Sequence, residues 1–402
     1  MTYKLPEGWR EVKLGEVVEY ETGKLNSNAS VENGKYPFFT CAPEPLRIND
    51  YKYDKEAILL AGNNAGGIFH VNRYCGKFNA YQRTYIMETK NKDVLCNDFL
   101  YYLLNINLNH FKNISSGSAT KFLTRKILDK INLRLPPLQE QKAISSTLSA
   151  LDDKIELNSK INKNLEDQAH TIFKHWFIDF EFPDENGNPY KSSGGEMVES
   201  ELGMIPKGWE VIKLKDIAKD IVLGKTPRTS IKEYFGGEVP FLTIPDMHNK
   251  VYVDNTERTL SDLGVNSQPH KTVPKNSVCV SCIATPGLVT ITKEPTQTNQ
   301  QINTIIPRIE YTYVYSFMKS ISNKIISLGS GGTTTNNLNK TEFSNIDILL
   351  PPKEIRSRYD KIAESLFVGV KGNQHQNQTL SQLRDTLLPK LMSGEVRIPL
   401  DE

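Results

Sequence analysis

Apolar residues recur at alternating intervals of four and three residues along a polar stretch near the middle of the chain. From position 144 the pattern selects Ile144, Leu148, Leu151, Ile155, Asn158, Asn162, Leu165, Ala169, Ile172 and Trp176. An average spacing of 3.5 residues is typical of a helix whose apolar seam packs against a second helix. The sequence therefore predicts a long coiled-coil helix here, with about 40 residues and a length of roughly 60 Å.

A second seam of the same kind occurs near the C-terminal end of the chain. It consists of Tyr359, Ala363, Leu366, Val370, Asn373, Asn377, Leu380, Arg384, Leu387 and Leu391. Both seams carry two asparagines near the middle, and the best-attested use of a buried Asn is to fix register and partner. Antiparallel pairing would bring Asn158 and Asn162 close to Asn373 and Asn377. We therefore predict one intramolecular antiparallel coiled coil with a globular domain at each end. The alternative is two amphipathic helices that each pack on their own globular half.

Each seam follows a region of short β-branched and aromatic runs, and the two regions open alike. "LPEGW" at 5–9 is echoed by "IPKGW" at 205–209, and both lead into the V-x-L alternation of a strand. The bodies then diverge, although "EAILLAGNNAGGIFHV" and "NSVCVSCIATPGLVTI" both have the pattern of a strand, a glycine-containing turn and a second strand. The sequence predicts two related domains that share a scaffold and differ in their loops.

The two halves agree again where each β-rich region meets its helix. Leu-Pro-Pro stands at 135–137 and at 350–352, and proline is tolerated in the first turn of a helix. We expect an α+β fold, in which two pseudo-repeated β-rich domains are joined by two long helices that form an antiparallel coiled coil. The expected segments are a first domain at 1–135, a first helical region at 136–180, a linker at 181–204, a second domain at 205–350 and a second helical region at 351–402.

The composition is that of a globular protein, and it gives only weak information about partners. The chain has 402 residues, and its formal net charge is +2. No overall basic field indicates a nucleic-acid partner, although acidic residues elsewhere can balance a basic face. The start of the chain has no targeting pattern and no stretch approaches 18 apolar residues, so we expect a cytoplasmic protein without a membrane span. Five cysteines without framework spacing fit a reducing compartment, and we expect Cys279 and Cys282 to be buried thiols.

Motifs that would indicate catalysis are incomplete. Asn188-Pro189-Tyr190 lacks the second proline of the Asn-Pro-Pro-Tyr box of adenine methyltransferases. Gly224-Lys225-Thr226 lacks the first glycine of a phosphate-binding loop, because Lys219 occupies that position. The sequence contains no hydrolase signature and no acidic cluster spaced like a nuclease site. Internal symmetry without a catalytic set favours a binding scaffold over an enzyme.

Several stretches resemble the specificity subunit of type I restriction-modification systems. They are the Pro-x-Gly-Trp openings, LPPLQEQ at 135–141, WFIDFEFP at 176–183, SSGGEMVESELGMIPKGWEV at 192–211 and the closing LLPKLMSGEVRI. The resemblance covers essentially the whole chain. One departure lies at 350–356, where the second copy reads LPPKEIR and lacks the Q-E-Q element.

The resemblance implies a non-catalytic DNA-reading subunit with two target recognition domains. Each domain would read one half of a bipartite asymmetric site in double-stranded DNA. The helices would set the spacer length and dock two modification (methyltransferase) subunits, and two restriction (motor and nuclease) subunits would join for cleavage. S-adenosylmethionine, ATP and Mg²⁺ would be used by those partners, and this chain would bind no cofactor. Two readers on a rod suit this role, because half-sites in successive major grooves lie ~34 Å apart.

Polar residues in the loops of both domains are the candidates for DNA contact. Asn and Gln suit adenine, Arg and Lys suit guanine, and Ser, Thr and Lys suit phosphates. The candidates in the first domain are Asn63, Asn64, Arg73, Lys77, Gln82 and Arg83, together with the loop residues Ser116, Ser118, Thr120 and Lys121. The candidates in the second domain are Thr226, Arg228, Thr285, Asn299, Gln300 and Gln301, together with the loop residues Ser330, Thr333, Thr334 and Asn336. For each residue the alternative is an ordinary solvated loop position.

A protein of another class would fit the same architecture. A two-headed adaptor would bind proteins at its β-rich ends and use the coiled coil as a spacer, and the small net charge is the feature that favours it. Salt separates the two hypotheses, because phosphate contacts release counterions and weaken steeply as the salt concentration rises.

Overall fold

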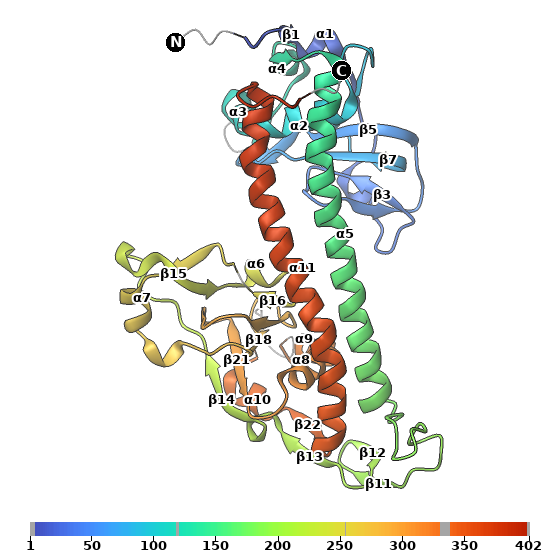
Figure 1. Ribbon diagram of the computed structural model, residues 1–402, viewed down its shortest axis with the longest axis vertical. Coiled ribbons are helices and arrows are strands. Elements are labelled where there is room, and N and C mark those ends of the chain that lie inside the picture. Colours follow the sequence, from blue (N-terminus) through green and yellow to red (C-terminus); the bar gives the residue numbers. More distant parts are fainter. Residues whose placement is uncertain (1–4, 118–119, 254, 330–337, 400–402) are drawn as a thin grey trace. The chain divides into compact units, whose positions relative to one another are not determined.

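The chain divides into two compact units, which are described one at a time. The first unit comprises Met1–Glu156 and Asn377–Glu402, and the second comprises Leu157–Gln376. The computed structural model describes residues 5–117, 120–253, 255–329 and 338–399. Helices α5 (Leu138–Phe177) and α11 (Lys353–Ser393) each run through both units (Figure 1). Each unit therefore contains a β-rich domain and one part of each long helix.

The first unit is built on a six-stranded sheet. The strands of the whole unit are β1 (Arg10–Lys13), β2 (Val18–Thr22), β3 (Tyr36–Phe39), β4 (Leu46–Ile48), β5 (Tyr53–Ala61), β6 (Asn63–Ala65), β7 (Val71–Ala80), β8 (Thr84–Thr89), β9 (Thr120–Phe122) and β10 (Asn132–Leu135). Its shorter helices are α1 (Leu14–Val17), α2 (Asn97–Ile106), α3 (Leu108–Ile114) and α4 (Arg125–Leu128). The sheet has the order β2-β8-β5-β7-β3-β4, and β1-β10 and β6-β9 form separate two-stranded ribbons.

Strand β5 shows why this sheet is buried on both faces. Successive side chains of a strand point to opposite faces. Ile58 and Leu60 join the larger apolar cluster, which also contains residues of α2 and α5. Ala57 and Leu59 join a smaller cluster on the other face, together with Phe78. The continuous apolar run of β5 is therefore a strand with a core on each side.

The second unit contains a five-stranded and a three-stranded sheet. Its strands are β11 (Met197–Ser200), β12 (Gly203–Pro206), β13 (Glu210–Lys213), β14 (Ala218–Leu223), β15 (Phe235–Leu242), β16 (Tyr252–Val253), β17 (Arg258–Leu260), β18 (Val278–Ser281), β19 (Val289–Thr292), β20 (Gln297–Thr298), β21 (Ile302–Pro307) and β22 (Asp347–Leu350). Its shorter helices are α6 (Ile244–Met247), α7 (Asp262–Asn266), α8 (Tyr311–Ser320), α9 (Ser322–Gly329) and α10 (Lys340–Ser344). The sheets have the orders β14-β21-β18-β19-β16 and β17-β15-β20, and β13-β22 and β11-β12 form ribbons.

The two cysteines of the C-x-x-C element are buried, as the sequence predicts. Cys279 lies in β18 between Val278 and Val280, and its side chain joins the opposite apolar cluster from theirs. Burial raises the pKa of Cys279 to about 12 and that of Cys282 to about 11. Both side chains are therefore protonated packing groups at neutral pH.

The internal repeat extends to individual main-chain hydrogen bonds. Ribbon β1-β10 of the first unit corresponds to ribbon β13-β22 of the second, and both are antiparallel. After the first strand of each ribbon, the amide of Leu14 donates to the carbonyl of Ile131, as the amide of Leu214 donates to that of Ile346, both at 2.8 Å. The expected pair of related domains is therefore confirmed.

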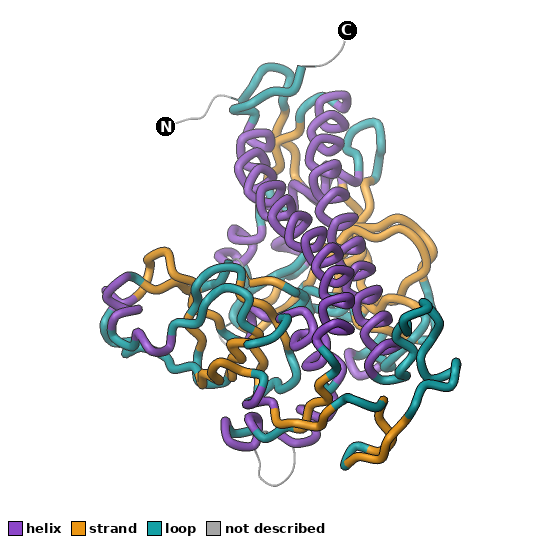
Figure 2. The backbone as a smooth tube through the Cα atoms, turned by 60° about the horizontal axis from the view of Figure 1, so that its bottom comes forward, coloured by secondary structure: helices purple, strands orange, loops and turns teal. Residues whose placement is uncertain are grey.

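The two long helices pair antiparallel in each unit, and they lie side by side in Figures 1 and 2. In the first unit Arg384 of α11 forms an ion pair with Asp152 of α5 at 2.8 Å. In the second unit the amide of Asn373 donates to Asn162 at 2.9 Å. The partner's number falls as the number in α5 rises, which is the mark of antiparallel helices. Every seam position named from the sequence is buried or half-buried. The α+β fold with an antiparallel coiled coil is confirmed.

Both long helices begin directly after Leu-Pro-Pro. The amide of Gln141 donates to the carbonyl of Pro137 at 3.0 Å, and the amide of Arg356 donates to that of Pro352 at 3.2 Å. Helix α11 is followed by Gly394, whose φ of +74° is a left-handed conformation that glycine adopts readily at a helix C-terminus. None of the helices in the described part of the chain combines the length and apolar character that a membrane span requires.

The segment expected as a linker is folded. It contains the antiparallel hairpin β11-β12, and the ring of Phe182 stacks on that of Tyr190 with centroids 4.5 Å apart. Phe182 also packs against Trp209. Its many Gly, Ser and Asn residues gave it the composition of a loop, whereas a few aromatic contacts and one hairpin hold its structure.

Candidate nucleic-acid interface

Ribbon β6-β9 brings two of the predicted loops of the first domain together. Asn63 pairs with Phe122, and Asn64 pairs with Lys121. The amide of Leu123 then donates to the carbonyl of Gly62 at 2.9 Å, which anchors the ribbon to the end of β5. The glycine-rich turn and the loop before β10 therefore form one surface, although they are far apart in the sequence.

The two asparagines of β6 line a hollow of about 410 Å³ together with Thr120. The thiol of Cys41 donates to Oδ1 of Asn63 at 2.8 Å, and Nδ2 of Asn64 donates to the carbonyl of Cys41 at 3.4 Å. Burial raises the pKa of the Cys41 thiol, so the group stays protonated and acts as the donor. These bonds orient both carboxamides while leaving them half-exposed.

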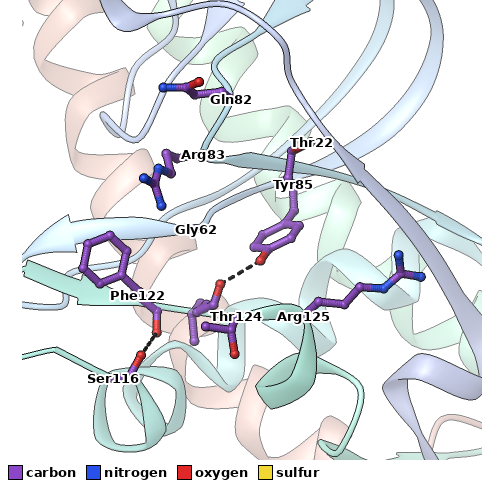
Figure 3. A pocket seen from close by; sticks show the side chains of 10 residues that line it. Thr22, Gly62, Gln82, Arg83, Tyr85, Ser116, Phe122, Thr124 and Arg125 are labelled. Atoms are coloured by element: carbon purple, nitrogen blue, oxygen red, sulfur yellow. Dashed lines mark hydrogen bonds between the residues drawn. The ribbon is translucent and has the colours of Figure 1, made fainter.

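A second hollow, of about 690 Å³, lies beside the turn that joins β7 to β8 (Figure 3). Predicted residues Gln82, Arg83 and Ser116 line it, together with Arg125. Among the described residues its lining contains two arginines and no carboxylate. Such a lining favours an anionic ligand, and phosphate is the anion that arginine commonly holds on DNA.

Aromatic rings support both arginines of this hollow. The guanidinium of Arg83 lies 5.5 Å from the centroid of the Phe122 ring, and that of Arg125 lies 5.1 Å from the centroid of the Tyr20 ring. The hydroxyl of Tyr85 donates to the carbonyl of Leu123 at 2.8 Å, and burial raises its pKa. The rings limit where each guanidinium can point without neutralising its charge.

In the second domain the candidates lie on the corresponding turn and entry loop. The hydroxyl of Thr226 donates to Oε1 of Gln300 at 2.7 Å. Asn299 and Gln301 bond to each other, with Nδ2 of Asn299 donating to Oε1 of Gln301 at 2.9 Å. Arg228 is exposed on the loop after β14. The structure thus brings Thr226 and the turn 299–301 together.

Thr285 lies on a different loop of the second domain. Its side chain is exposed, and its carbonyl accepts a hydrogen bond from the hydroxyl of Ser281 at 2.6 Å. This bond fixes the loop between β18 and β19. The corresponding part of the first domain is the glycine-rich turn after β5.

Two predicted residues of the first domain have partners elsewhere in the sheet. Arg73 of β7 forms an ion pair with Asp98 of α2 and lies 5.8 Å from the centroid of the Tyr101 ring. Lys77, farther along β7, is exposed, with its amine 4.6 Å from the centroid of the Tyr51 ring. Neither residue lines the two hollows described above. A further set of candidates lies outside the described residues: Ser118, Ser330, Thr333, Thr334 and Asn336.

Three further groups of this surface were not predicted from the sequence: Arg125, Tyr85 and the thiol of Cys41. Arg125 is the first residue of α4, four positions after Lys121, where the predicted loop ends. The signal was present, because "KFLTRK" places three cations within six residues. Tyr85 and Cys41 carry no local signal, since only the pairing of the strands brings them to the surface.

Amides connect the two long helices near the middle of the seams. Nδ2 of Asn158 donates to Oε1 of Gln376 at 2.7 Å, and Asn373 donates to Asn162 as described above. Nδ2 of Asn377 donates to the carbonyl of Ile155 at 3.2 Å. The four asparagines thus take part in interhelical bonds, and the bond between Asn373 and Asn162 joins two of them directly. The other two bonds named here use a neighbouring glutamine and a main-chain carbonyl.

The LPPLQEQ element serves the internal structure of the first unit. Glu140 accepts hydrogen bonds from Nε of Arg397 at 3.0 Å, from Nη2 of Arg397 at 2.7 Å and from the indole of Trp9 at 3.2 Å. Nε2 of Gln141 donates to the carbonyl of Pro136 at 3.0 Å and to that of Val94 at 2.9 Å. Together these bonds connect both ends of the chain to the start of α5.

The second copy of this element has different chemistry in the same place. Arg356 corresponds to Gln141, and its Nη1 donates to the carbonyl of Pro351 at 3.0 Å. Its Nε donates to Glu310 at 3.0 Å, and the side chains of both residues are largely buried. The loss of Q-E-Q in the sequence is therefore accompanied by a new ion pair.

The chain is similar to known proteins over most of its length. A family model described as "Type I restriction modification DNA specificity domain" matches residues 6–167 and 206–384. The "Type I restriction enzyme HindI specificity subunit" of Haemophilus influenzae is 36% identical over 374 residues, covering 78% of this chain and 81% of that protein. The "Type I restriction enzyme MjaIX specificity subunit" of Methanocaldococcus jannaschii is 26% identical over 427 residues, covering 98% and 95%. The crystal structure of a type I restriction-modification S subunit from M. genitalium shares the fold, with a TM-score of 0.59 at 17% identity over 99% of both chains.

Proposed function

Because the chain belongs to the family of type I restriction-modification DNA specificity subunits, we propose that it reads a bipartite site in double-stranded DNA. Each β-rich domain reads one half-site through the loops described above, and the two halves of the site differ in sequence. The helices set the length of the spacer between the half-sites. The chain gives the complex its sequence specificity and performs no chemistry itself.

One observation carries this proposal. The same main-chain framework occurs in both units, with equivalent bonds such as Leu14 to Ile131 and Leu214 to Ile346, yet the exposed loop residues differ. A repeated scaffold with different polar loops is what two readers of different half-sites require. The aromatic-backed arginines of the first domain support contact with a polyanion.

The partners follow from the family. The chain acts with the methyltransferase and restriction subunits of its complex, and we propose two copies of each. S-adenosylmethionine, ATP and Mg²⁺ belong to the reactions of those subunits. Docking of the modification subunits on the coiled coil would leave the β-rich domains available for DNA.

A domain exchange tests the independence of the two readers. The full chain is assembled with its modification subunits, and the methylated sequence is determined from a duplex library. Residues 1–135 are then replaced by the corresponding segment of a family member with a different target. We expect one half of the methylated site to change while the other half and the spacer stay the same. A change in both halves would contradict independent reading.

Salt dependence separates DNA reading from the alternative adaptor function. A protein with six to ten phosphate contacts loses on the order of 10³-fold or more in affinity between about 50 and 200 mM salt. We expect a loss of this size for a duplex that carries the site. Binding to DNA that is weak at all salt concentrations, with tight binding of a protein that stays constant with salt, would favour the adaptor.

A further inference from the structure

One turn occupies the same place in both domains. Residues 81–83 join β7 to β8 in the first domain, and residues 299–301 join β20 to β21 in the second. Three main-chain bonds of the first turn have an equivalent in the second. The first turn has Tyr81 N to Phe39 O at 2.9 Å, Thr84 N to Tyr81 O at 2.8 Å and Gly62 N to Arg83 O at 2.8 Å. In the same order, the second turn has Asn299 N to Leu242 O at 3.0 Å, Ile302 N to Asn299 O at 3.2 Å and Cys282 N to Gln301 O at 2.8 Å. The main chain therefore presents the second and third side chains of each turn in the same way.

A glycine packs tightly against each turn. A Cβ atom on Gly23 would lie 2.1 Å from the carbonyl oxygen of Ala80, and one on Gly224 would lie 2.1 Å from that of Asn299. The amides of the two glycines also bond equivalent carbonyls at the start of the next strand. Contact this close leaves the turn little freedom. A rigid main chain is what accurate placement of a base-reading side chain requires.

The side chains on the two turns differ in what they can offer to a ligand. In the first turn Gln82 and Arg83 are both exposed, and Arg83 forms no ion pair with any residue that the structure describes. In the second turn Gln300 is exposed and oriented by Thr226. Gln301, the counterpart of Arg83, has its carbonyl group bonded to Asn299. The first turn thus offers a guanidinium and an amide, and the second offers one oriented amide.

Arginine forms two parallel hydrogen bonds with O6 and N7 of guanine, and glutamine forms two with N6 and N7 of adenine. We propose that this turn is the base-reading element of both domains. Arg83 reads a guanine in the first half-site, and Gln300 reads an adenine in the second. The inference rests on the proposed DNA-reading function, and it assigns one base in each half-site to a named side chain.

The test uses the full chain assembled with its modification subunits and a duplex library randomised across both half-sites. Sequencing of the methylated duplexes gives the preference at each position. For Arg83→Ala we expect the preference for guanine to fall about 5- to 150-fold at a single position of one half-site, which is the range for a bidentate base contact. The other half-site should keep its sequence. Gln300→Ala should relax one adenine in the opposite half.

Arg125→Ala is the matched control, because Arg125 lines the same hollow from α4, whereas Arg83 lies on the turn (Figure 3). If it holds a phosphate, its loss weakens binding to all sequences alike and lowers the salt slope by about one. Arg83→Lys provides a second test, since it keeps the charge and loses the planar fork. It should retain general DNA affinity while the preference for guanine falls.

Different results would overturn the assignment of Arg83 and the proposed function. The assignment of Arg83 as a guanine reader is overturned if Arg83→Ala weakens binding to all sequences equally. It is also overturned if the variant keeps the parental melting temperature and the parental base preferences. Selection of no sequence by the unmodified complex overturns the proposed function itself. That failure is distinguishable, because it appears before any substitution is made.

Discussion

At the scale of single residues, Glu140 is a buried carboxylate that needs partners for its charge. Its side chain is 2% exposed, and a bidentate ion pair with Arg397 and a bond from Trp9 satisfy its oxygens. The carboxylate holds the pKa of Arg397 above its usual value. A buried carboxylate that loses its cation is strongly destabilising. The contribution of Glu140 to stability therefore depends on Arg397.

We expect Arg397→Ala to lower the melting temperature by on the order of 5 °C at neutral pH. The reason is that Glu140 then keeps a buried carboxyl group without its cation. Thermal unfolding of the variant and of the parent measures the difference.

The double variant Arg397→Ala with Glu140→Gln serves as its control. It removes the carboxylate together with its cation, so it should recover part of the stability that Arg397→Ala loses. A double variant no more stable than Arg397→Ala would show that Arg397 contributes packing and not charge.

The candidate site also shows what residue types alone can and cannot predict. Residue chemistry selected Arg83 and Gln82, which line one hollow, but it also selected Arg73, whose guanidinium pairs with Asp98. Position along a strand does not reveal which face a residue occupies when both faces are covered. Arg125 was missed because the predicted loop ends at Lys121, although the cation-rich run KFLTRK continues beyond it.

At the scale of elements, substitution of Asn162 and Asn373 tests whether the bond between them determines the alignment of the two long helices. We expect Asn162→Leu to destabilise the protein by about 1–3 kcal/mol, because the amide of Asn373 loses its acceptor inside the seam. The double variant with Asn373→Leu should recover that stability or exceed the parent, since an apolar pair replaces a polar one. Thermal unfolding measures both.

The double variant should also lose specificity of pairing, because a polar residue in a seam specifies register and oligomeric state. Sedimentation should then detect species larger than the monomer. A double variant that stays monomeric would argue against a role of this amide pair in alignment.

Elements with a strong period were predictable, whereas elements made by distant pairing were not. The seams of α5 and α11 follow from the spacing of their apolar residues, and the helix starts follow from Leu-Pro-Pro. Ribbon β6-β9 joins two three-residue strands, too short for any alternation to be read. The two four-residue strands of hairpin β11-β12 are also too short to be read, although Val198 and Ile205 pair with each other and pack on the core of the unit.

At the scale of the whole molecule, the length of the coiled coil is the quantity that the proposed function makes measurable. One heptad inserted in α5 after Glu156 and another in α11 after Gln376 keep both seams in phase. Seven residues add about 10 Å of helix, which is the length of about three base pairs. We expect the preferred spacer to become longer, as read from the methylated library. Insertion in α5 alone, which leaves one heptad of α5 without a partner on α11, should abolish selection. An unchanged spacer with both insertions would contradict the role of the helices.

The two helix starts also constrain how genes of this kind can recombine. Gln141 binds main-chain carbonyls, which any sequence supplies, so a crossover upstream of it leaves its bonds intact. Arg356 needs the carboxylate of Glu310, and a crossover between positions 310 and 356 would separate a buried cation from this acidic partner. Exchange of recognition segments that keep the tryptophan at position 9, which bonds Glu140, should therefore be freer in the first half of the gene than in the second. Breakpoints in the second half should be confined to the flanks of that interval.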